Sequence, residues 1–251
     1  MRSILLVITL LAAAPAWVCA QSVPNGQAQI LDGPRCSATI GSGGNLKLPS
    51  GETLQGKCEG AGTTPVLTEG GRVIEFTIRS DRSTEKDRTE LAFTEKKSRF
   101  QFGRLYAVSF DVEMPPSGVT NDFFYVAQFW QSPTKPPIAG VRVQRGLSGK
   151  ATVMARGDGS PPEGKSIAEV DLRPDAWVSV AIRIKVAPGD GSCIEATIDG
   201  VAAPRWCGSI GYADDKDAMP WYRFKFGIYK GSEPGKQFRV RFRNISIRAI
   251  G

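Results

Sequence analysis

The chain has 251 residues, and its 32 Lys and Arg against 25 Asp and Glu give a formal net charge of +7 at pH 7. It contains no histidine, which excludes Ser-His-Asp catalysis, Cys-His catalysis, histidine-ligated zinc and any imidazole base. The positive charge favours acidic partners.

Residues 1–20 have the pattern of a secretory signal peptide. Arg2 precedes an apolar run over residues 4–14, and Val18-Cys19-Ala20 offers small side chains suited to signal peptidase. The run is too short to span a membrane. We therefore expect cleavage after Ala20 and a secreted or periplasmic protein that has no contact with a membrane.

Cleavage there leaves four cysteines, Cys36, Cys58, Cys193 and Cys207. An even number in an exported chain predicts two disulfides, and the Cys-x-x-Cys spacing typical of a zinc site is missing. Four cysteines allow three connectivities. We favour the sequence neighbours, Cys36 with Cys58 and Cys193 with Cys207. A three-residue hairpin turn over residues 199–201 would place Cys193 opposite Cys207.

The mature chain changes composition along its length. Residues 21–71 are rich in Gly, Ser, Thr and Pro, and we interpret them as an irregular, disulfide-tied segment. In residues 72–251, β-rich runs alternate with turn residues, which predicts an all-β sandwich. The expected strands are residues 73–78, 88–93, 104–113, 123–130, 140–145, 151–155, 177–186, 192–198, 223–229 and 238–247.

The stretch over residues 221–230 has one apolar and one cationic face when it is read with the two-residue period of a strand. The two faces are formed by Phe224, Phe226 and Ile228, and by Arg223, Lys225, Gly227 and Tyr229. An acidic polymer would fit the second face. The alternative is an amphipathic strand with a solvated outer face.

Three further expected strands carry polar side chains on one face. Arg88 and Glu90 alternate with Thr89, Leu91 and Phe93 in strand 88–93, and Arg142 lies between Val141 and Val143 in strand 140–145. In strand 123–130, the alternation separates Phe123, Tyr125, Ala127 and Phe129 from Phe124, Val126, Gln128 and Trp130. We expect these polar faces to share one surface with the cationic face of strand 223–229.

Three sequence blocks resemble, in order, the motifs of jelly-roll polysaccharide lyases. They are Arg88-Thr89-Glu90-Leu91, Gln128-Phe129-Trp130, and residues 222–229, which read Tyr-Arg-Phe-Lys-Phe-Gly-Ile-Tyr. The family blocks read Arg-(Ser/Thr)-Glu-Leu, Gln-x-His and Tyr-Phe-Lys-x-Gly-x-Tyr. They occur in alginate lyases and in heparin lyase I and glucuronan lyase relatives. The resemblance spans residues 72–250.

The resemblance implies a β-jelly roll of the concanavalin A-like type, with two antiparallel sheets and a concave substrate groove. It also implies β-elimination, in which the C5 proton of a uronate is removed and the glycosidic bond to its O4 breaks. Matched to the motifs, Arg88, Gln128 and Lys225 would neutralise the uronate carboxylate, and Tyr229 would serve as base, acid or both. The substrate-binding positions would be Trp130, Glu90, Arg142 and Arg223.

Trp130 departs from the family pattern, because a histidine usually stands at this position. An indole can stack on a sugar ring, but it cannot carry a proton or a positive charge. Two functions are therefore weighed first, a lyase that works through Tyr229 and a carbohydrate-binding homologue without activity. A structural domain and a glycoside hydrolase using Asp111 and Glu113 are further alternatives.

We expect an acidic polysaccharide as the partner, such as glucuronan, alginate or a glycosaminoglycan. We expect no nucleic acid partner, a monomeric protein, and no cofactor or metal. Asp214, Asp215 and Asp217 could form a calcium loop, but we favour a solvated loop at this place.

Overall fold

The computed structural model describes residues 41–47, 53–60, 62–79, 86–93, 99–114, 124–143, 150–171, 173, 176–231, 233 and 235–250. The expected signal peptide and Cys36 lie outside these residues. Within them, the chain forms seventeen strands and two three-residue 3-10 helices. The strands pair antiparallel in two sheets, so the prediction of an all-β sandwich is confirmed. None of the helices in this described part is long and apolar enough to cross a membrane.

The first sheet has nine strands in the order β1-β2-β5-β16-β8-β9-β10-β11, and β6 pairs with β16. Its strands are β1 (Gly41–Lys47), β2 (Thr53–Glu59), β5 (Lys86–Phe93), β6 (Arg99–Gln101), β8 (Phe124–Trp130), β9 (Ala139–Val143), β10 (Lys150–Ala155), β11 (Lys165–Asp171) and β16 (Trp221–Gly231).

The second sheet has eight strands in the order β14-β13-β12-β7-β17-β4-β3, and β15 pairs with β13. Its strands are β3 (Val66–Thr68), β4 (Val73–Arg79), β7 (Leu105–Glu113), β12 (Val178–Lys185), β13 (Ser192–Ile198), β14 (Val201–Ala202), β15 (Trp206–Gly208) and β17 (Gln237–Ile250). The helices are η1 (Glu69–Gly71) and η2 (Gly189–Gly191).

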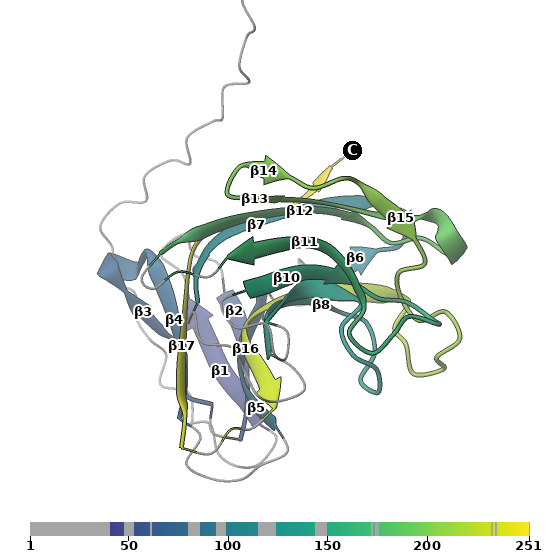
Figure 1. The fold of residues 1–251 in the computed structure, drawn as a ribbon. Coiled ribbons are helices and arrows are strands. Elements are labelled where there is room, and N and C mark those ends of the chain that lie inside the picture. Colours follow the sequence, from purple (N-terminus) through teal and green to yellow (C-terminus); the bar gives the residue numbers. More distant parts are fainter. Residues whose placement is uncertain are drawn as a thin grey trace, which may run out of the picture.

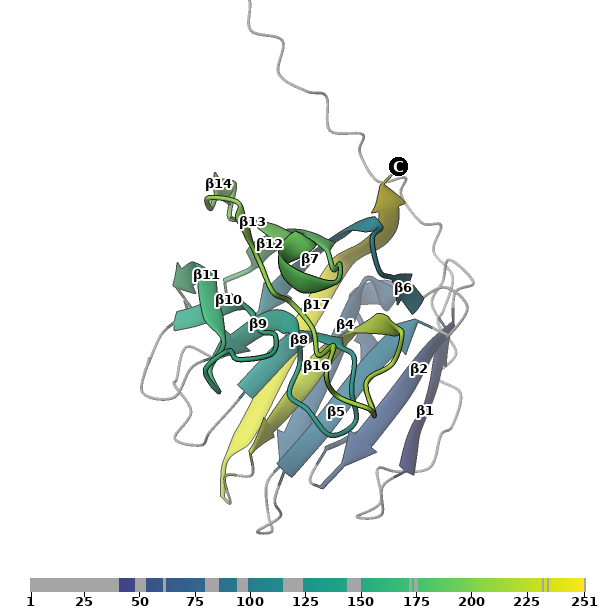
Figure 2. The same cartoon turned by 90° about the vertical axis from the view of Figure 1, so that its right-hand side faces the viewer.

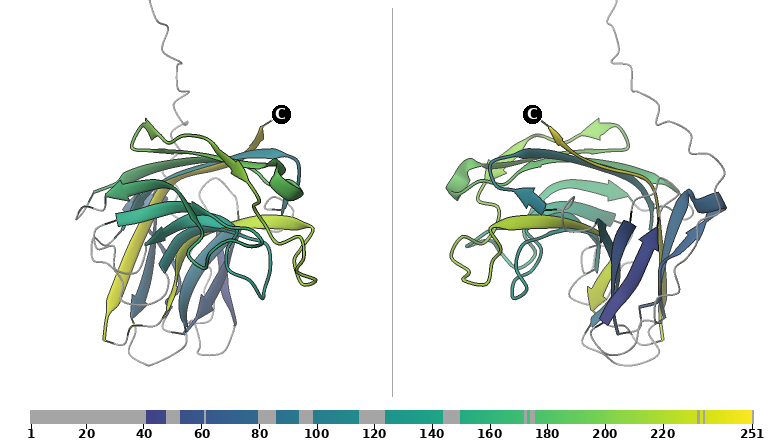
Figure 3. Two further views of the ribbon diagram at one scale, coloured as in Figure 1. Left: turned by 45° about the vertical axis from the view of Figure 1, so that its right-hand side comes forward. Right: turned by 180° about the vertical axis from the view of Figure 1, so that it is seen from behind.

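Both sheets are strongly curved, and the second sheet wraps around the first. In Figure 1, β7, β12 and β13 arch over β8, β10 and β11, and the views in Figure 3 show the same arrangement from two further sides. The nine-stranded sheet is therefore the inner sheet, and the face that it turns away from the outer sheet is concave. We refer to this face as the concave face.

The hydrophobic core lies between the sheets and is rich in aromatic rings. Phe76 of β4 meets Phe226 of β16 and Phe242 of β17 edge to face, with centroid distances of 5.8 and 5.6 Å. All three side chains are fully buried. Each buried phenylalanine contributes about 2 to 3 kcal/mol, so this packing fixes which face of β16 points inward and which lies on the concave face.

Strands β1 and β2 extend the inner sheet beyond β5. Leu54 of β2 is opposite Phe93 of β5, and Leu46 and Leu54 are buried in the core. The interpretation of residues 21–71 as an irregular segment is therefore wrong for β1, β2 and β3. Glycines and polar residues obscured β1 and β2, each of which places a leucine in the core.

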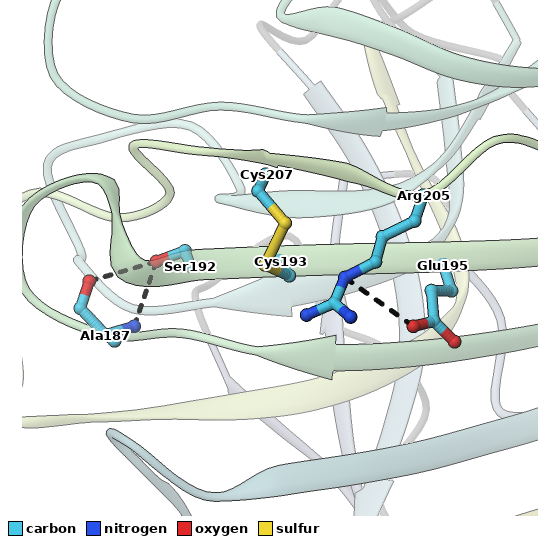
Figure 4. Close-up of a disulfide and its surroundings, with 6 residues drawn as sticks. All are labelled: Ala187, Ser192, Cys193, Glu195, Arg205 and Cys207. Atoms are coloured by element: carbon cyan, nitrogen blue, oxygen red, sulfur yellow. Dashed lines mark hydrogen bonds and ion pairs between the residues drawn. A yellow bond between two sulfur atoms is a disulfide. The ribbon is translucent and has the colours of Figure 1, made fainter.

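The predicted disulfide between Cys193 and Cys207 is confirmed. The two residues are directly opposite in the pairing of β13 with β15, with a Cα–Cα distance of 4.1 Å, and Figure 4 shows the bond between the strands. The turn before it is two residues long, because Ile198 pairs with Val201, so the expected three-residue turn is wrong. Cys58 is disulfide-bonded, and its predicted partner lies outside the described residues.

An irregular register on β8 changes which of its side chains face the core. Tyr125 is opposite Arg142 and Ala127 is opposite Val141, so Val126 is an extra residue relative to β9. A β-bulge of this kind resets the alternation of a strand. Phe124, Val126, Ala127 and Phe129 all belong to the core, whereas Tyr125 shares the concave face with Gln128. The strict alternation expected for strand 123–130 is therefore wrong.

Gly227 occupies the matching irregularity on β16, where the register with β8 shifts between Phe226 and Tyr229. Its φ is 131°, and a Cβ there would lie 2.3 Å from the carbonyl oxygen of Thr89 and 2.8 Å from a ring carbon of Phe76. Gly227→Ala is expected to lower the free energy of unfolding by about 2 to 3 kcal/mol, because the backbone conformation and the contacts both oppose a methyl group. Urea unfolding measures this change.

Gly103→Ala is the matched control, because Gly103 also has a positive φ, +80°, but has open space around it. Its loss of stability should be clearly smaller. Equal losses for the two variants would contradict the steric explanation for Gly227.

Candidate functional site

Four neighbouring strands of the inner sheet bring two arginines and two tyrosines into one row on the concave face. Arg88 of β5 is opposite Tyr229 of β16, and Tyr229 is opposite Tyr125 of β8. Tyr125 is in turn opposite Arg142 of β9. Figure 2 shows these strands side by side in the order β9, β8, β16 and β5. The backbone register alone therefore sets the order of the row.

The side chains of this row stack on one another. The Arg88 guanidinium carbon lies 4.0 Å from the centroid of the Tyr229 ring, and the Tyr229 and Tyr125 rings are 6.2 Å apart with an interplanar angle of 21°. The Arg142 guanidinium carbon lies 5.7 Å from the Tyr125 ring. A cation over an aromatic face is attractive, so each tyrosine is held between its neighbours and both phenols lie beside positive charge.

Glu90 fixes the groups next to Tyr229. Its carboxylate lies 3.3 Å from Nε of Arg88 and accepts a hydrogen bond from Nε2 of Gln128. A second carboxylate, that of Glu59 on β2, lies 3.7 Å from Nη1 of Arg88. Glu90 is 3% exposed, and breaking a buried pair by removing one partner is costly. Arg88 and Gln128 are thus held in one orientation.

Lys225 lies on the same face of β16, opposite Gln128. Its side chain is buried, and its ammonium nitrogen is 4.4 Å from the centroid of the Trp130 ring. Burial away from water lowers the pKa of Lys225 to about 7. The carboxylate of Glu90 opposes this shift, and the cations of Arg88, Lys57 and Arg223 add to it.

Aromatic residues border the site beyond Lys225. Trp130 is opposite Arg223, and its ring lies 6.2 Å from that of Trp221. Arg223 donates hydrogen bonds to Oε1 of Gln55, at 2.8 Å, and to the carbonyl oxygen of Phe93, at 3.3 Å. The two indoles are partly exposed, so they offer flat apolar surface beside the cationic groups.

The turn between β10 and β11 covers the other end of the row. Arg142 donates a hydrogen bond to the carbonyl oxygen of Glu163 at 3.0 Å. Arg156, which is 4% exposed, donates to the hydroxyl of Tyr125 at 3.4 Å and to the carbonyl oxygen of Pro162. Arg156 therefore orients the Tyr125 phenol, and the turn contacts Arg142 through the carbonyl group of Glu163.

Comparison with known proteins identifies the fold. No protein-family model and no curated protein sequence matches the chain. An endo-β-1,4-glucuronan lyase from the fungus Trichoderma reesei matches in structure with a TM-score of 0.55 and 15% identity, over 78% of this chain and 87% of that chain. The fold is that of the jelly-roll polysaccharide lyases.

Two further solved structures of the same fold support this identification. Alginate lyase AlgAT5 from polysaccharide lyase family 7 has a TM-score of 0.53 at 14% identity, over 74% of this chain and 82% of that chain. A mutant of alginate lyase Aly36B, in complex with an alginate trisaccharide, has a TM-score of 0.54 at 13% identity, over 77% of this chain and 88% of that chain. The expected jelly-roll architecture is therefore confirmed.

All eight side chains that sequence analysis proposed for the site come from neighbouring strands of this jelly roll. Arg88, Glu90, Gln128, Trp130, Arg142, Arg223, Lys225 and Tyr229 lie on β5, β8, β9 and β16. The sequence analysis missed Lys57, Glu59, Tyr125 and Arg156. Lys57 and Glu59 lie two residues apart on β2, a spacing that indicates a shared strand face, but the surrounding glycines made the strand hard to recognise. The local sequence gives no indication of a role for Arg156.

The acidic loop before β16 is held by hydroxyl groups. The Asp215 carboxylate accepts hydrogen bonds from Ser132 at 2.5 Å and from Thr134 at 3.1 Å, and these bonds lower the pKa of Asp215. Among the residues that the structure describes, no group of three or more His, Cys, Asp or Glu side chains is placed to hold a metal ion. Asp215 thus ties its loop to the segment that follows β8.

Proposed function

We propose that this protein is an exported polysaccharide lyase that cleaves a uronate polymer by β-elimination. The observation that carries the proposal is the row in which Tyr229 lies directly against the Arg88 guanidinium, with Gln128 and Lys225 beside it on the concave face. The names of the similar solved structures place glucuronan and alginate among the substrates of this fold. The disulfide between Cys193 and Cys207 supports export to an oxidising compartment.

The first task of such a site is to neutralise the uronate carboxylate. A proton next to a carboxylate is only weakly acidic, because its removal adds a second negative charge to the same group. Donors that are already in place stabilise this charge without reorganisation. The groups suited to this task are Arg88, Gln128 and Lys225, and Glu90 holds the first two in position.

The second task is proton transfer. Removal of the C5 proton leaves an electron pair that forms the C4=C5 double bond, and the bond from C4 to the glycosidic oxygen breaks. The departing oxygen needs a proton, and the hydroxyl of Tyr229 can supply it. Tyr229 therefore serves as the acid, the base or both, with the Arg88 guanidinium against its ring.

The concave face also suits a long acidic chain. Lys57, Arg142 and Arg223 lie on the strands around the tyrosines, and the whole chain carries a formal charge of +7. Glucuronan, alginate and glycosaminoglycans all carry a carboxylate on the uronate that would be cleaved. We propose one of these polymers as the substrate, bound by a monomer without a cofactor.

The test is the ultraviolet absorbance of the unsaturated uronate during incubation with each of these polymers. A rise on at least one polymer is expected, and the responsive polymer identifies the substrate. Addition of a chelator should leave the rate unchanged. No rise on any uronate polymer, with a correctly folded protein, would contradict the proposal.

A second candidate function is carbohydrate binding without cleavage. The observation that favours it is Trp130, an indole on the concave face at the position where the resembling lyases have histidine. A sugar ring can stack on a flat indole. In this case the protein would bind the same polymers and form no unsaturated product.

Trp130→Ala tests the stacking role under either function. Loss of one aromatic contact is worth about 1 kcal/mol, so retention on an immobilised acidic polysaccharide should weaken about 3- to 10-fold. Trp177→Ala is the matched control, because Trp177 lies against Arg243 of the outer sheet, 4.2 Å from its guanidinium carbon. Equal retention of the Trp130 variant and the unaltered protein would exclude the stacking role.

A further inference from the structure

The site has few groups that could accept the C5 proton. The chain has no histidine, and arginine does not lose its proton in proteins. The Glu90 carboxylate is already engaged by Arg88 and Gln128, and the Glu59 carboxylate by Arg88 and Lys86. Among the described side chains around Tyr229 on the concave face, the lysines and tyrosines remain as candidates.

Lys225 differs from the other cations of the site in its surroundings. Only 8% of it is exposed, and within the described residues no carboxylate lies within ion-pair distance of its nitrogen. That nitrogen instead lies over the ring of Trp130, at 4.4 Å from the centroid. A buried amine without a carboxylate partner has little to hold its proton.

The position of Lys225 relative to Tyr229 is also suitable. Phe226 and Ile228 point into the core, so only Gly227, which has no side chain, separates the two on their shared face of β16. We propose that the neutral amine of Lys225 accepts the C5 proton of the uronate and that Tyr229 acts as the acid. This inference rests on the proposed function and deepens it: Lys225 takes part in proton transfer, and Arg88 and Gln128 are left to neutralise the carboxylate.

The step balances with these two groups alone. The lone pair of the Lys225 amine takes the C5 proton, the C5–H electron pair becomes the C4=C5 double bond, and the C4–O bond breaks with its electrons on oxygen. That oxygen takes the phenolic proton of Tyr229. The new ammonium lies beside the charge that accumulates on the carboxylate, and it then returns its proton to the phenolate. No other reactant is required.

Burial, assisted by the cations that face Lys225 and opposed by Glu90, keeps the amine available near neutral pH. Arg88 and Glu90 face it from β5, Lys57 from β2 and Arg223 from its own strand, while Gln128 and Trp130 on β8 are uncharged. With a pKa of about 7, the amine is charged below this pH and neutral above it. Turnover should therefore rise with pH through about 7, because the reactive form is the deprotonated one.

Lys225→Arg separates a proton acceptor from a fixed charge. Arginine keeps the positive charge and cannot accept a proton at these pH values. We expect the variant to retain the polymer on an affinity gel and to form unsaturated product at least about 100-fold more slowly than the unaltered protein. Lys150→Arg is the matched control, because Lys150 is exposed and paired with Glu169 at 3.3 Å; its rate should not change.

Arginine is larger than lysine and could disturb the fold at this buried position, so a smaller substitution serves as a second test. In Lys225→Ala, an added primary amine should restore part of the product formation, in proportion to its neutral fraction. A merely structural role would give no such dependence. Product formation by Lys225→Arg at the rate and with the pH profile of the unaltered protein would overturn the inference and leave the lyase function intact. No product from the unaltered protein would overturn both.

Discussion

Tyr229→Phe is expected to lower the formation of unsaturated product by about 10²- to 10⁴-fold, the range typical for removal of a general acid or base. The substitution deletes one oxygen atom. The ring remains between the Arg88 guanidinium and the Tyr125 ring, so the shape and charge of the concave face are preserved. Initial rates of absorbance increase at saturating polymer measure the effect.

Two observations accompany this variant. Its retention on the polymer gel should match that of the unaltered protein, because the cations that bind carboxylates are still present. Tyr222→Phe is the matched control, since Tyr222 lies on the same strand but faces the core, 5.3 Å from the Phe100 ring. Product formation by Tyr229→Phe at the normal rate would remove Tyr229 from the mechanism.

Arg88→Ala is expected to lower turnover about 10²- to 10³-fold. This is the typical effect of removing one preorganised donor from a site where negative charge develops. The guanidinium contacts Glu90, Glu59 and the Tyr229 ring, so alanine removes three contacts at once. Its removal also takes one cationic partner from each of two carboxylates, and stability should fall by about 3 kcal/mol. Turnover and urea unfolding are measured on the same samples.

Arg88→Lys and Arg183→Ala separate the two effects. Lysine restores the charge but not the forked geometry, so stability should recover more than turnover. Arg183 forms an exposed pair with Glu195 on the outer sheet, at 3.2 Å, and exposed pairs contribute less than about 1 kcal/mol. An Arg88→Ala protein that is destabilised but turns over normally would show that Arg88 is only structural.

The sequence allowed prediction of the sandwich and of the strands that carry the motifs. The expected strand at residues 223–229 is the centre of β16, and that at residues 88–93 lies within β5. These segments are regular, and their apolar side chains recur with the period of a strand. Their pairing places Arg88 directly opposite Tyr229, which is why two motifs distant in sequence meet.

The position of Tyr125 on the concave face could not be predicted from the sequence. Its orientation depends on one extra residue, Val126, in the pairing of β8 with β9. An apolar residue in a row of apolar residues gives no sign of a bulge. Strand β2 was missed because its own sequence pattern is weak. Its pairing with β5 compensates for this weakness in the folded protein. Arg156 reaches Tyr125 only through the tertiary fold.

The lack of a carboxylate partner for Lys225 among the described residues could not be predicted either. Its motif marks a lysine on the concave face, but its lowered pKa depends on burial in the folded protein and on charges that β5 and β2 bring to it. The missing histidine was visible in the sequence. The fold provides Lys225 as a candidate for the proton transfer that a histidine would perform. Its ammonium nitrogen lies over the ring of Trp130, which stands at the position of the family histidine.

The mass of the products tests the central claim most directly. Elimination gives one fragment that is lighter by one water than the corresponding product of hydrolysis, because it ends in an unsaturated uronate. We predict this lighter fragment when glucuronan, alginate or a glycosaminoglycan is incubated with the unaltered protein, and its near absence with Tyr229→Phe. Fragments with the mass of hydrolysis products, or intact polymer that is bound but never cleaved, would contradict the account.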